Sequence, residues 1–175
     1  TTFRLTADVE APSGMESFVF MSGDCKVDTS DYYDPSVKRK MILRGFAANA
    51  SASLAVYGGG ELELMQAHAG SPFTKVEVGE GTTLTLSELP GSTSYGPLHT
   101  DEIVLGKDSV LNIPAGFNSV RAARWTVDPS AKINITFADG LATDAIGLLY
   151  DISGDYRVPE NQIHLKGATG DASGG

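Results

Sequence analysis

The sequence is poor in the residues that build disulfide frameworks and metal centres. Its 175 residues include a single cysteine, Cys25, and three histidines. One cysteine excludes an intrachain disulfide and a cysteine-based zinc site. The histidines, His68, His99 and His164, are far apart in the sequence and show none of the short spacings of metal-binding motifs. Neither a disulfide-stapled nor a zinc-stabilised fold is therefore expected.

Long hydrophobic runs and a surplus of basic residues are also missing. No run of about 18 apolar residues occurs, so no membrane-spanning helix is predicted. The chain has 13 basic and 22 acidic side chains and a formal net charge of −9. Because phosphate contacts need a surplus of Lys and Arg, we expect no nucleic-acid partner. The 41% of hydrophobic residues is too high for a disordered chain, and the length fits one domain.

What the chain does contain is a repeat with the alternation of β-strands. Two apolar-x-apolar pairs, separated by five residues, occur together at 54–64, 76–86, 103–113 and 125–135. All sixteen key positions are apolar, including Trp125, which is therefore predicted to lie in the core. Between the pairs stand residues that favour turns, such as Gly58–Gly60 and Asp128–Ser130.

The spacing of the copies predicts the architecture. Equivalent residues Val56, Val78, Leu105 and Val127 are 22, 27 and 22 positions apart, and the longer interval contains a predicted loop insertion at Pro90–Pro97. Two strands and a bend per 22 residues are typical of a β-solenoid, in which stacked coils share one core. Stacking would align Glu63, Thr85, Asn112 and Asn134 on an outer face. The alternative is a β-sandwich or jelly roll with similar hairpins.

We therefore predict an all-β chain, a short right-handed β-solenoid with irregular capping ends. The single domain is expected to span residues 1–166, with regular repeats at 50–137 and a flexible glycine-rich tail at 167–175. Residues 1–45 and 138–165 are the expected caps, which protect the end strands from pairing with other chains. Two looser copies are predicted there, Phe18–Phe20 with Cys25–Val27 and Tyr156–Val158 with Ile163–Leu165.

The stretch from Val78 to Leu86, with its relatives beginning at Leu105 and Val127, resembles the rungs of bacterial autotransporter passenger domains. The resemblance covers residues 50 to 137, about half of the chain. It implies a right-handed β-helix that is secreted or held at the cell surface. It carries over no catalytic residue.

One short motif hints at catalysis. Asp28-Thr29-Ser30 resembles the Asp-Thr-Gly/Ser signature of aspartic proteases. In that family two such loops face each other, and their carboxylates share one proton and activate a water. The chain has no second copy of the motif, so a catalytic pair would need a homodimer or another Asp. Lys26 and Asp31 also make the flanks more polar than in the family. The competing interpretation is an ordinary turn at the end of a strand.

Two other kinds of site are candidates. Asp24, Asp28, Asp31 and Asp34 form an oxygen-rich cluster that could hold Ca²⁺, although their spacing matches no known calcium loop. A solvated acidic surface is the alternative, and no other cofactor is expected. Exposed aromatic residues in turns would suit stacking against sugars, and Tyr57, Tyr95 and Phe117 are the candidates.

The sequence-based function is accordingly a secreted or surface-exposed β-rich module that binds extracellular glycoprotein or glycan ligands. The repeat, the acidic balance and the lack of a complete catalytic motif favour it. The alternative is a secreted aspartic-type protease that acts on glycoproteins such as mucin through Asp28.

Overall fold

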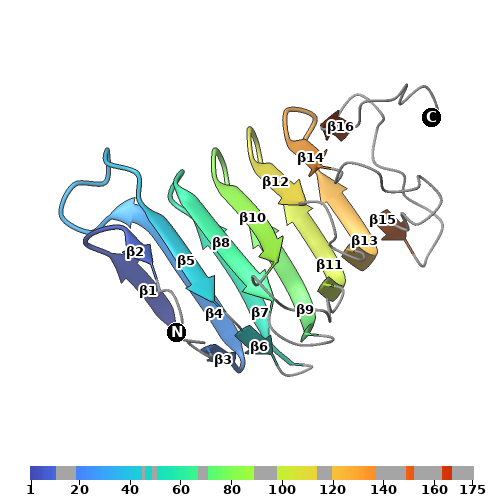
Figure 1. Cartoon of the computed structure of the whole chain (residues 1–175), viewed down its shortest axis with the longest axis horizontal. Coiled ribbons are helices and arrows are strands. Elements are labelled where there is room, and N and C mark those ends of the chain that lie inside the picture. Colours follow the sequence, from blue (N-terminus) through green and yellow to red (C-terminus); the bar gives the residue numbers. More distant parts are fainter. Residues whose placement is uncertain are drawn as a thin grey trace.

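The chain folds into two parallel β-sheets that face each other. The computed structural model describes residues 1–10, 19–44, 46–48, 51–66, 71–88, 98–113, 120–136, 149–151 and 163–166. Apart from two short strands, consecutive strands alternate between two seven-stranded sheets, which we call sheet A and sheet B, so the chain winds into stacked coils (Figure 1). Sandwiches and jelly rolls are built from antiparallel strands. The all-β solenoid prediction is therefore confirmed.

The strands follow the chain in simple order. Sheet A contains β1 (Thr2–Leu5), β4 (Asp24–Asp31), β7 (Ser53–Tyr57), β9 (Ser71–Val78), β11 (Leu98–Leu105), β13 (Val120–Val127) and β15 (Leu149–Asp151). Sheet B contains β2 (Val9–Glu10), β5 (Lys40–Arg44), β8 (Glu61–Gln66), β10 (Thr83–Glu88), β12 (Val110–Ile113), β14 (Lys132–Thr136) and β16 (Ile163–Lys166). A third, two-stranded sheet joins β3 (Val19–Met21) to β6 (Phe46–Ala48).

Equivalent residues of the sequence repeat lie side by side on neighbouring strands of both sheets. In sheet A the stacked residues are Val56, Val78, Leu105 and Val127. In sheet B they are Leu62, Leu84, Leu111 and Ile133. Because side chains alternate between the two faces of a strand, this register sends every apolar pair to the same side.

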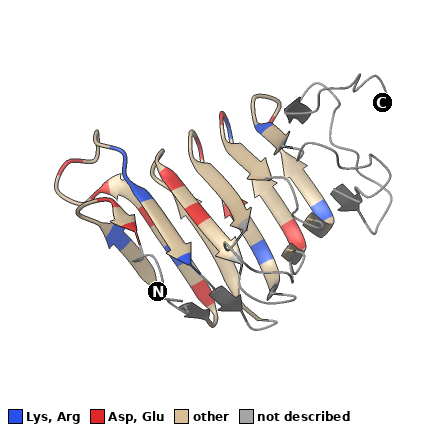
Figure 2. Cartoon of the chain, in the orientation of Figure 1, with Lys and Arg blue, Asp and Glu red and all other residues tan. Residues whose placement is uncertain are grey.

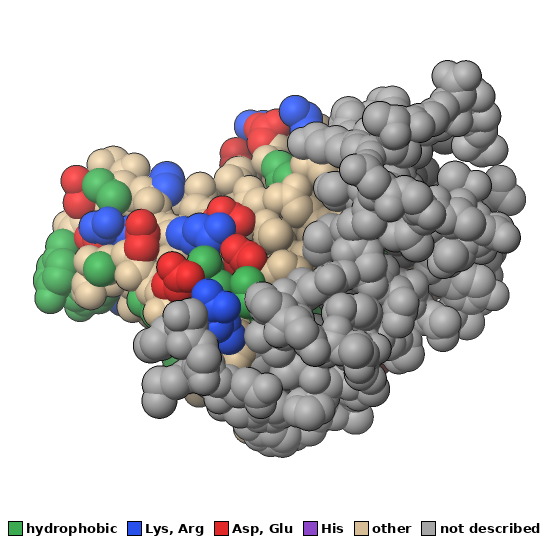
Figure 3. Space-filling view, viewed as in Figure 1, with side chains coloured by type: hydrophobic (Ala, Val, Ile, Leu, Met, Phe, Trp, Pro, Cys, Tyr) green, Lys and Arg blue, Asp and Glu red, His purple; other side chains and the backbone are tan. Residues whose placement is uncertain are grey.

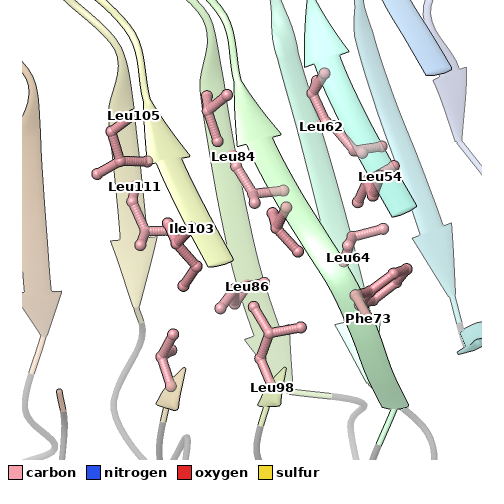
Figure 4. Packing of buried hydrophobic residues seen from close by; sticks show 14 of the residues in the cluster. Leu54, Leu62, Leu64, Phe73, Leu84, Leu86, Leu98, Ile103, Leu105 and Leu111 are labelled. Atoms are coloured by element: carbon pink, nitrogen blue, oxygen red, sulfur yellow. The ribbon is translucent and has the colours of Figure 1, made fainter. Parts of the chain in front are cut away.

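The core is the space between the two sheets. The inward-facing leucines and isoleucines of both sheets interdigitate there, and most are almost completely inaccessible to solvent (Figure 4). Trp125 is 4% exposed and belongs to this cluster, as predicted. Burying one such side chain contributes about 1.5–3 kcal/mol. A single coil has only one layer of these residues, so its stability depends on the coils above and below it.

The coils begin earlier than the regular repeat does. Cys25–Val27, expected to be the second apolar pair of a copy, is the first pair of its coil, because Cys25 and Val27 lie beside Leu54 and Val56. Its second pair is Met41 and Leu43 in β5. The spacing was misleading because eight residues separate β4 from β5, whereas three or four separate the paired strands of the coils from β7 to β14.

At the other end, Ile163 and Leu165 stack on Ile133 and Ile135, as expected for a second apolar pair. Other predictions fall on parts of the chain outside the described residues. These are the insertion at Pro90–Pro97, the pair at Tyr156–Val158 and the tail at 167–175.

The turns between the sheets stack as closely as the strands do. Gly60 lies against the backbone of the preceding coil: a Cβ atom there would contact the carbonyl oxygen of Arg39 and lie 2.7 Å from that of Thr29. Gly81, in the next turn, has a φ of +62° and open space around it. The two glycines are therefore needed for different reasons, close backbone approach for Gly60 and a left-handed conformation for Gly81.

We expect Gly60→Ala to destabilise the protein by about 3 kcal/mol, because rigid backbone atoms would have to move. Gly81→Ala should cost only about 1 kcal/mol, the strain of a left-handed alanine. Urea unfolding followed by circular dichroism measures both changes. Equal losses for the two variants would contradict the close stacking of the turns.

Small polar side chains fill one buried position of these turns. Thr82 and Ser109 occupy equivalent places, and Ala131 follows one coil later. The Thr82 hydroxyl accepts a hydrogen bond from the Gly59 N–H at 2.9 Å. The Ser109 hydroxyl is the one buried side-chain polar atom without a protein hydrogen-bond partner among the described residues. An unpartnered buried hydroxyl costs free energy.

Ser109→Ala should therefore raise the free energy of unfolding by about 1 kcal/mol, since alanine is already accommodated at position 131. Thr82→Ala should lower it by about 1–2 kcal/mol, because the Gly59 N–H loses its acceptor. Paired urea titrations test the difference. A loss of stability in Ser109→Ala would show that the hydroxyl is satisfied.

Candidate functional site

The protease-like motif lies inside a strand. Asp28, Thr29 and Ser30 belong to β4, so the interpretation as a turn at a strand end is wrong. Thr29 points inward and is completely buried, while Asp28 and Ser30 are partly exposed on the opposite side. β4 continues past the motif because its last inward residue, Asp31, finds polar partners of its own.

Asp28 uses its carboxylate to hold its own strand. Oδ1 accepts hydrogen bonds from the backbone N–H of Ser30 at 3.1 Å and from its hydroxyl at 2.6 Å. The same two bonds occur at Asp34 with Ser36, at 3.1 and 2.6 Å, and at Asp128 with Ser130, at 2.9 and 2.7 Å. Asp-x-Ser is thus a recurring local structure of this chain, in which the side chain satisfies nearby backbone groups.

A catalytic carboxylate pair is not formed within the described part of the chain. No hydrogen bond there joins Asp28 to another carboxyl group. Arg4 in β1 is the cross-strand neighbour of Asp28 on one side, and Tyr57 in β7 on the other. A shared proton requires two carboxyl groups in contact.

Thr29 fastens two coils together. Its hydroxyl donates a hydrogen bond to the carbonyl oxygen of Tyr57 at 2.7 Å and accepts one from the N–H of Gly60 at 2.8 Å. The glycine run Gly58–Gly60 is pressed against the motif, since a Cβ on Gly58 would lie 2.6 Å from the Asp28 carboxylate. The threonine of the motif therefore has a structural role between neighbouring coils.

The four aspartates proposed as calcium ligands point to separate partners. Asp24 accepts a hydrogen bond from Ser53, Asp28 from Ser30, and Asp34 from Ser36. Among the described residues, no group of three or more His, Cys, Asp or Glu side chains is arranged to hold a metal ion.

Asp31 is the buried centre of the β4–β5 loop. Its Oδ1 accepts hydrogen bonds from the N–H groups of Tyr33 at 2.8 Å and Asp34 at 2.9 Å. Its Oδ2 meets the guanidinium of Arg39, with Nε at 2.8 Å and a terminal nitrogen at 2.7 Å. The Asp34 N–H and Arg39 hold the pKa of Asp31 below its ordinary value of 3.8. The carboxylate is therefore charged and fully engaged at neutral pH.

The predicted aromatic platform is present only in part. Tyr57 is the last residue of β7 rather than a loop residue, and it is half-buried. Tyr95 and Phe117 lie outside the described residues. The exposed aromatic side chains of the described part are instead Tyr32, Tyr33 and Phe3. The signal for the tyrosines was available in the sequence, because the loop that carries them is longer than the other turns.

The outer face of sheet B carries the polar row that the repeat predicted. Glu63, Thr85, Asn112 and Asn134 occupy successive strands in one register. Asn134 donates a hydrogen bond to Asn112 at 2.8 Å, and Asn112 donates one to Thr85 at 3.1 Å. Thr85 in turn donates to Glu61 at 2.8 Å. We call these five residues the polar ladder.

The N-terminal end of the polar ladder is charged. Lys40 in β5 contacts two glutamates of the adjacent strand β8, Glu63 at 2.9 Å and Glu61 at 3.4 Å. Figure 2 shows basic and acidic residues on these two neighbouring strands. Burial raises the pKa of Glu63, but hydrogen bonds from Ser87 and Lys40 outweigh burial and hold the pKa below its ordinary value. The ladder thus passes from charged groups at one end to neutral amides at the other.

None of the described segments is a helix of the length and apolarity needed to cross a bilayer.

The role of Asp31 predicts a pH-dependent stability. Because its pKa is lowered in the folded state, its contribution is complete above the unfolded pKa, near 3.8, and disappears as the pH falls through the folded value. Asp31→Asn should therefore lower the melting temperature at pH 7, and its difference from the parent should shrink below about pH 4. Asp108→Asn, at an exposed turn, is the control and should leave the profile unchanged. A constant Asp31→Asn deficit down to pH 2 would contradict this role.

The chain was compared with protein-family models, with curated proteins and with solved structures. No family model matches it, no curated protein matches it, and no solved structure matches it. The argument for function therefore rests on the arrangement of its own residues.

Proposed function

We propose that this protein is a secreted or cell-surface β-solenoid module that binds glycan or glycoprotein ligands without transforming them. The observation that carries the proposal is the polar ladder on the outer face of sheet B. It places hydroxyl, amide and carboxylate groups on four successive strands, at the regular spacing of a parallel sheet. Repeating polar groups of this kind suit a ligand that is itself a repeating chain of hydroxyl-rich units.

The neighbouring contacts make the ladder a prepared surface. Hydrogen bonds link Glu61, Thr85, Asn112 and Asn134 in series, and Ser87 and Lys40 hold Glu63, so little conformational entropy is lost when a ligand binds. The side chains are only partly buried, which leaves acceptor positions open toward solvent.

The protease alternative has less support from the geometry. Oδ1 of Asp28 accepts a hydrogen bond from the Ser30 hydroxyl, as Asp34 and Asp128 do in the other two Asp-x-Ser sequences. The Thr29 hydroxyl accepts a hydrogen bond from Gly60 in the next coil. A protease of this type would have to bring a second carboxyl group to Asp28 from a partner molecule.

The proposal predicts binding that depends on the ladder. The parent protein should bind members of an immobilised panel of mucin and N-glycan structures. Thr85→Ala, which removes the hydroxyl between Glu61 and Asn112, should weaken that binding about fivefold, a loss of about 1 kcal/mol. Thr126→Ala is the matched control, since Thr126 is an exposed threonine on the outer face of sheet A and should bind as the parent does.

Three results would contradict the proposal. A parent protein that binds nothing on the panel would exclude glycan recognition, and equal losses in Thr85→Ala and Thr126→Ala would exclude the ladder. Cleavage of mucin below pH 5 that is abolished in Asp28→Asn would instead establish the protease alternative.

A further inference from the structure

We propose that the loop between β4 and β5, residues 32–39, is a second contact surface, and that it recognises a carboxylate-bearing sugar at the end of a glycan chain. We call it the tyrosine loop. The inference rests on the proposed function and adds the place and the charge of one ligand group. Its evidence is separate from that of the polar ladder.

The tyrosine loop is longer than the equivalent turns of the solenoid. Eight residues separate β4 from β5, whereas three or four close the equivalent turns from β7 to β14. The shorter turns show that the connection itself does not require the added length. Three of the five large apolar or aromatic side chains that are exposed in the described structure lie in this loop, namely Tyr32, Tyr33 and Val37. Figure 3 shows hydrophobic side chains gathered at the end of the molecule where Figure 1 shows the first coils.

Hydrogen bonds and an ion pair of Asp31, at the end of β4, hold the loop in one conformation. Asp31 binds the N–H groups of Tyr33 and Asp34 and is itself fixed by Arg39. Asp34 closes a second turn through Ser36, and the Val37 carbonyl oxygen accepts a hydrogen bond from the Asp31 N–H at 2.9 Å. Burying a carboxylate costs desolvation free energy, and a connection that only joins two sheets does not require a buried carboxylate.

Two tyrosines are presented on this support. Tyr33 is 80% exposed and Tyr32 is 52% exposed, and their rings meet edge to face with centroids 5.1 Å apart. The Tyr32 N–H donates a hydrogen bond to the Leu5 carbonyl oxygen at 2.7 Å, which ties the loop to β1. Rigid, exposed tyrosines lose little entropy on binding and dominate many recognition surfaces.

The cation beside the tyrosines indicates the ligand's charge. The guanidinium of Arg4 lies over the ring of Tyr32, 5.8 Å from its centroid. Lys38, in the same loop, donates a hydrogen bond to the Pro35 carbonyl oxygen at 3.0 Å. Both cations are exposed, and neither forms an ion pair with any described residue. In a chain of net charge −9, an exposed, unpaired arginine at an aromatic surface favours an anionic group. Arginine pairs with a planar carboxylate in a bidentate manner, which suits the acidic group of a terminal sugar.

The experiment compares three small probes by titration NMR on the full chain: 3′-sialyllactose, 3′-sulfolactose and lactose. The parent should bind 3′-sialyllactose at least tenfold more tightly than lactose, with chemical-shift changes at Tyr32 and Tyr33. Tyr33→Ala and Arg4→Lys should each weaken 3′-sialyllactose binding at least fivefold, and Lys38→Gln should weaken it severalfold. Lys132→Gln removes another exposed, unpaired cation, on β14, and should bind as the parent does.

The outcomes separate this inference from the proposed function. Equal affinity for 3′-sialyllactose and lactose, or stronger binding of 3′-sulfolactose, would overturn the carboxylate assignment. Parent-like binding by Tyr33→Ala and Arg4→Lys would overturn the location while the ladder remained. Dependence on the ladder alone, measured with Thr85→Ala, would leave the proposed function intact without this second surface. Circular dichroism of every variant confirms that the solenoid is still folded.

Discussion

The register between neighbouring coils is the constraint on which the rest of this structure depends. In a parallel stack each strand obtains its hydrogen bonds, and apolar contacts along the core, from the coils before and after it. A shift of one residue would turn Leu62 and Leu84 outward and bring Glu61 and Thr83 into the core. The same register that buries the apolar columns also aligns the polar ladder. Core and outer face are therefore two consequences of one alignment.

The turns extend that register around the edge of the molecule. Gly60 permits two coils to approach at their backbones, and the buried hydroxyls of Thr29 and Thr82 accept hydrogen bonds from N–H groups of the glycine turn at Gly58–Gly60. Thr29 and Thr82 are therefore buried polar residues that join neighbouring coils. In the Asp28 motif, Thr29 joins two coils, while Asp28 and Ser30 bond to each other within β4.

The sequence predicted correctly those coils in which the apolar pairs recur at a regular spacing. The columns through Val56 and Leu62 repeat at nearly constant spacing, so hydrophobic alternation alone located them correctly. The coil around Val27 was assigned to the wrong sheet because the tyrosine loop lengthens its turn and removes the regular spacing. For the same reason the pairing of Asp31 with Arg39 could not be inferred, since neither residue belongs to a repeated position.

The amino-acid sequence alone determined the all-β character, the coil repeat and the composition of the outer polar row, because these depend on alternation, which is local. The Asp-x-Ser sequences and the clustered aspartates were also visible in the sequence, but their hydrogen-bond partners could not be identified from it. Only the tertiary structure decided that Asp28 supports its own strand, that Asp31 is a buried anchor, and that Tyr32 and Tyr33 stand exposed beside Arg4. The physical reason is that each of these roles depends on contacts between coils or across an irregular loop, and such contacts have no fixed spacing in the chain.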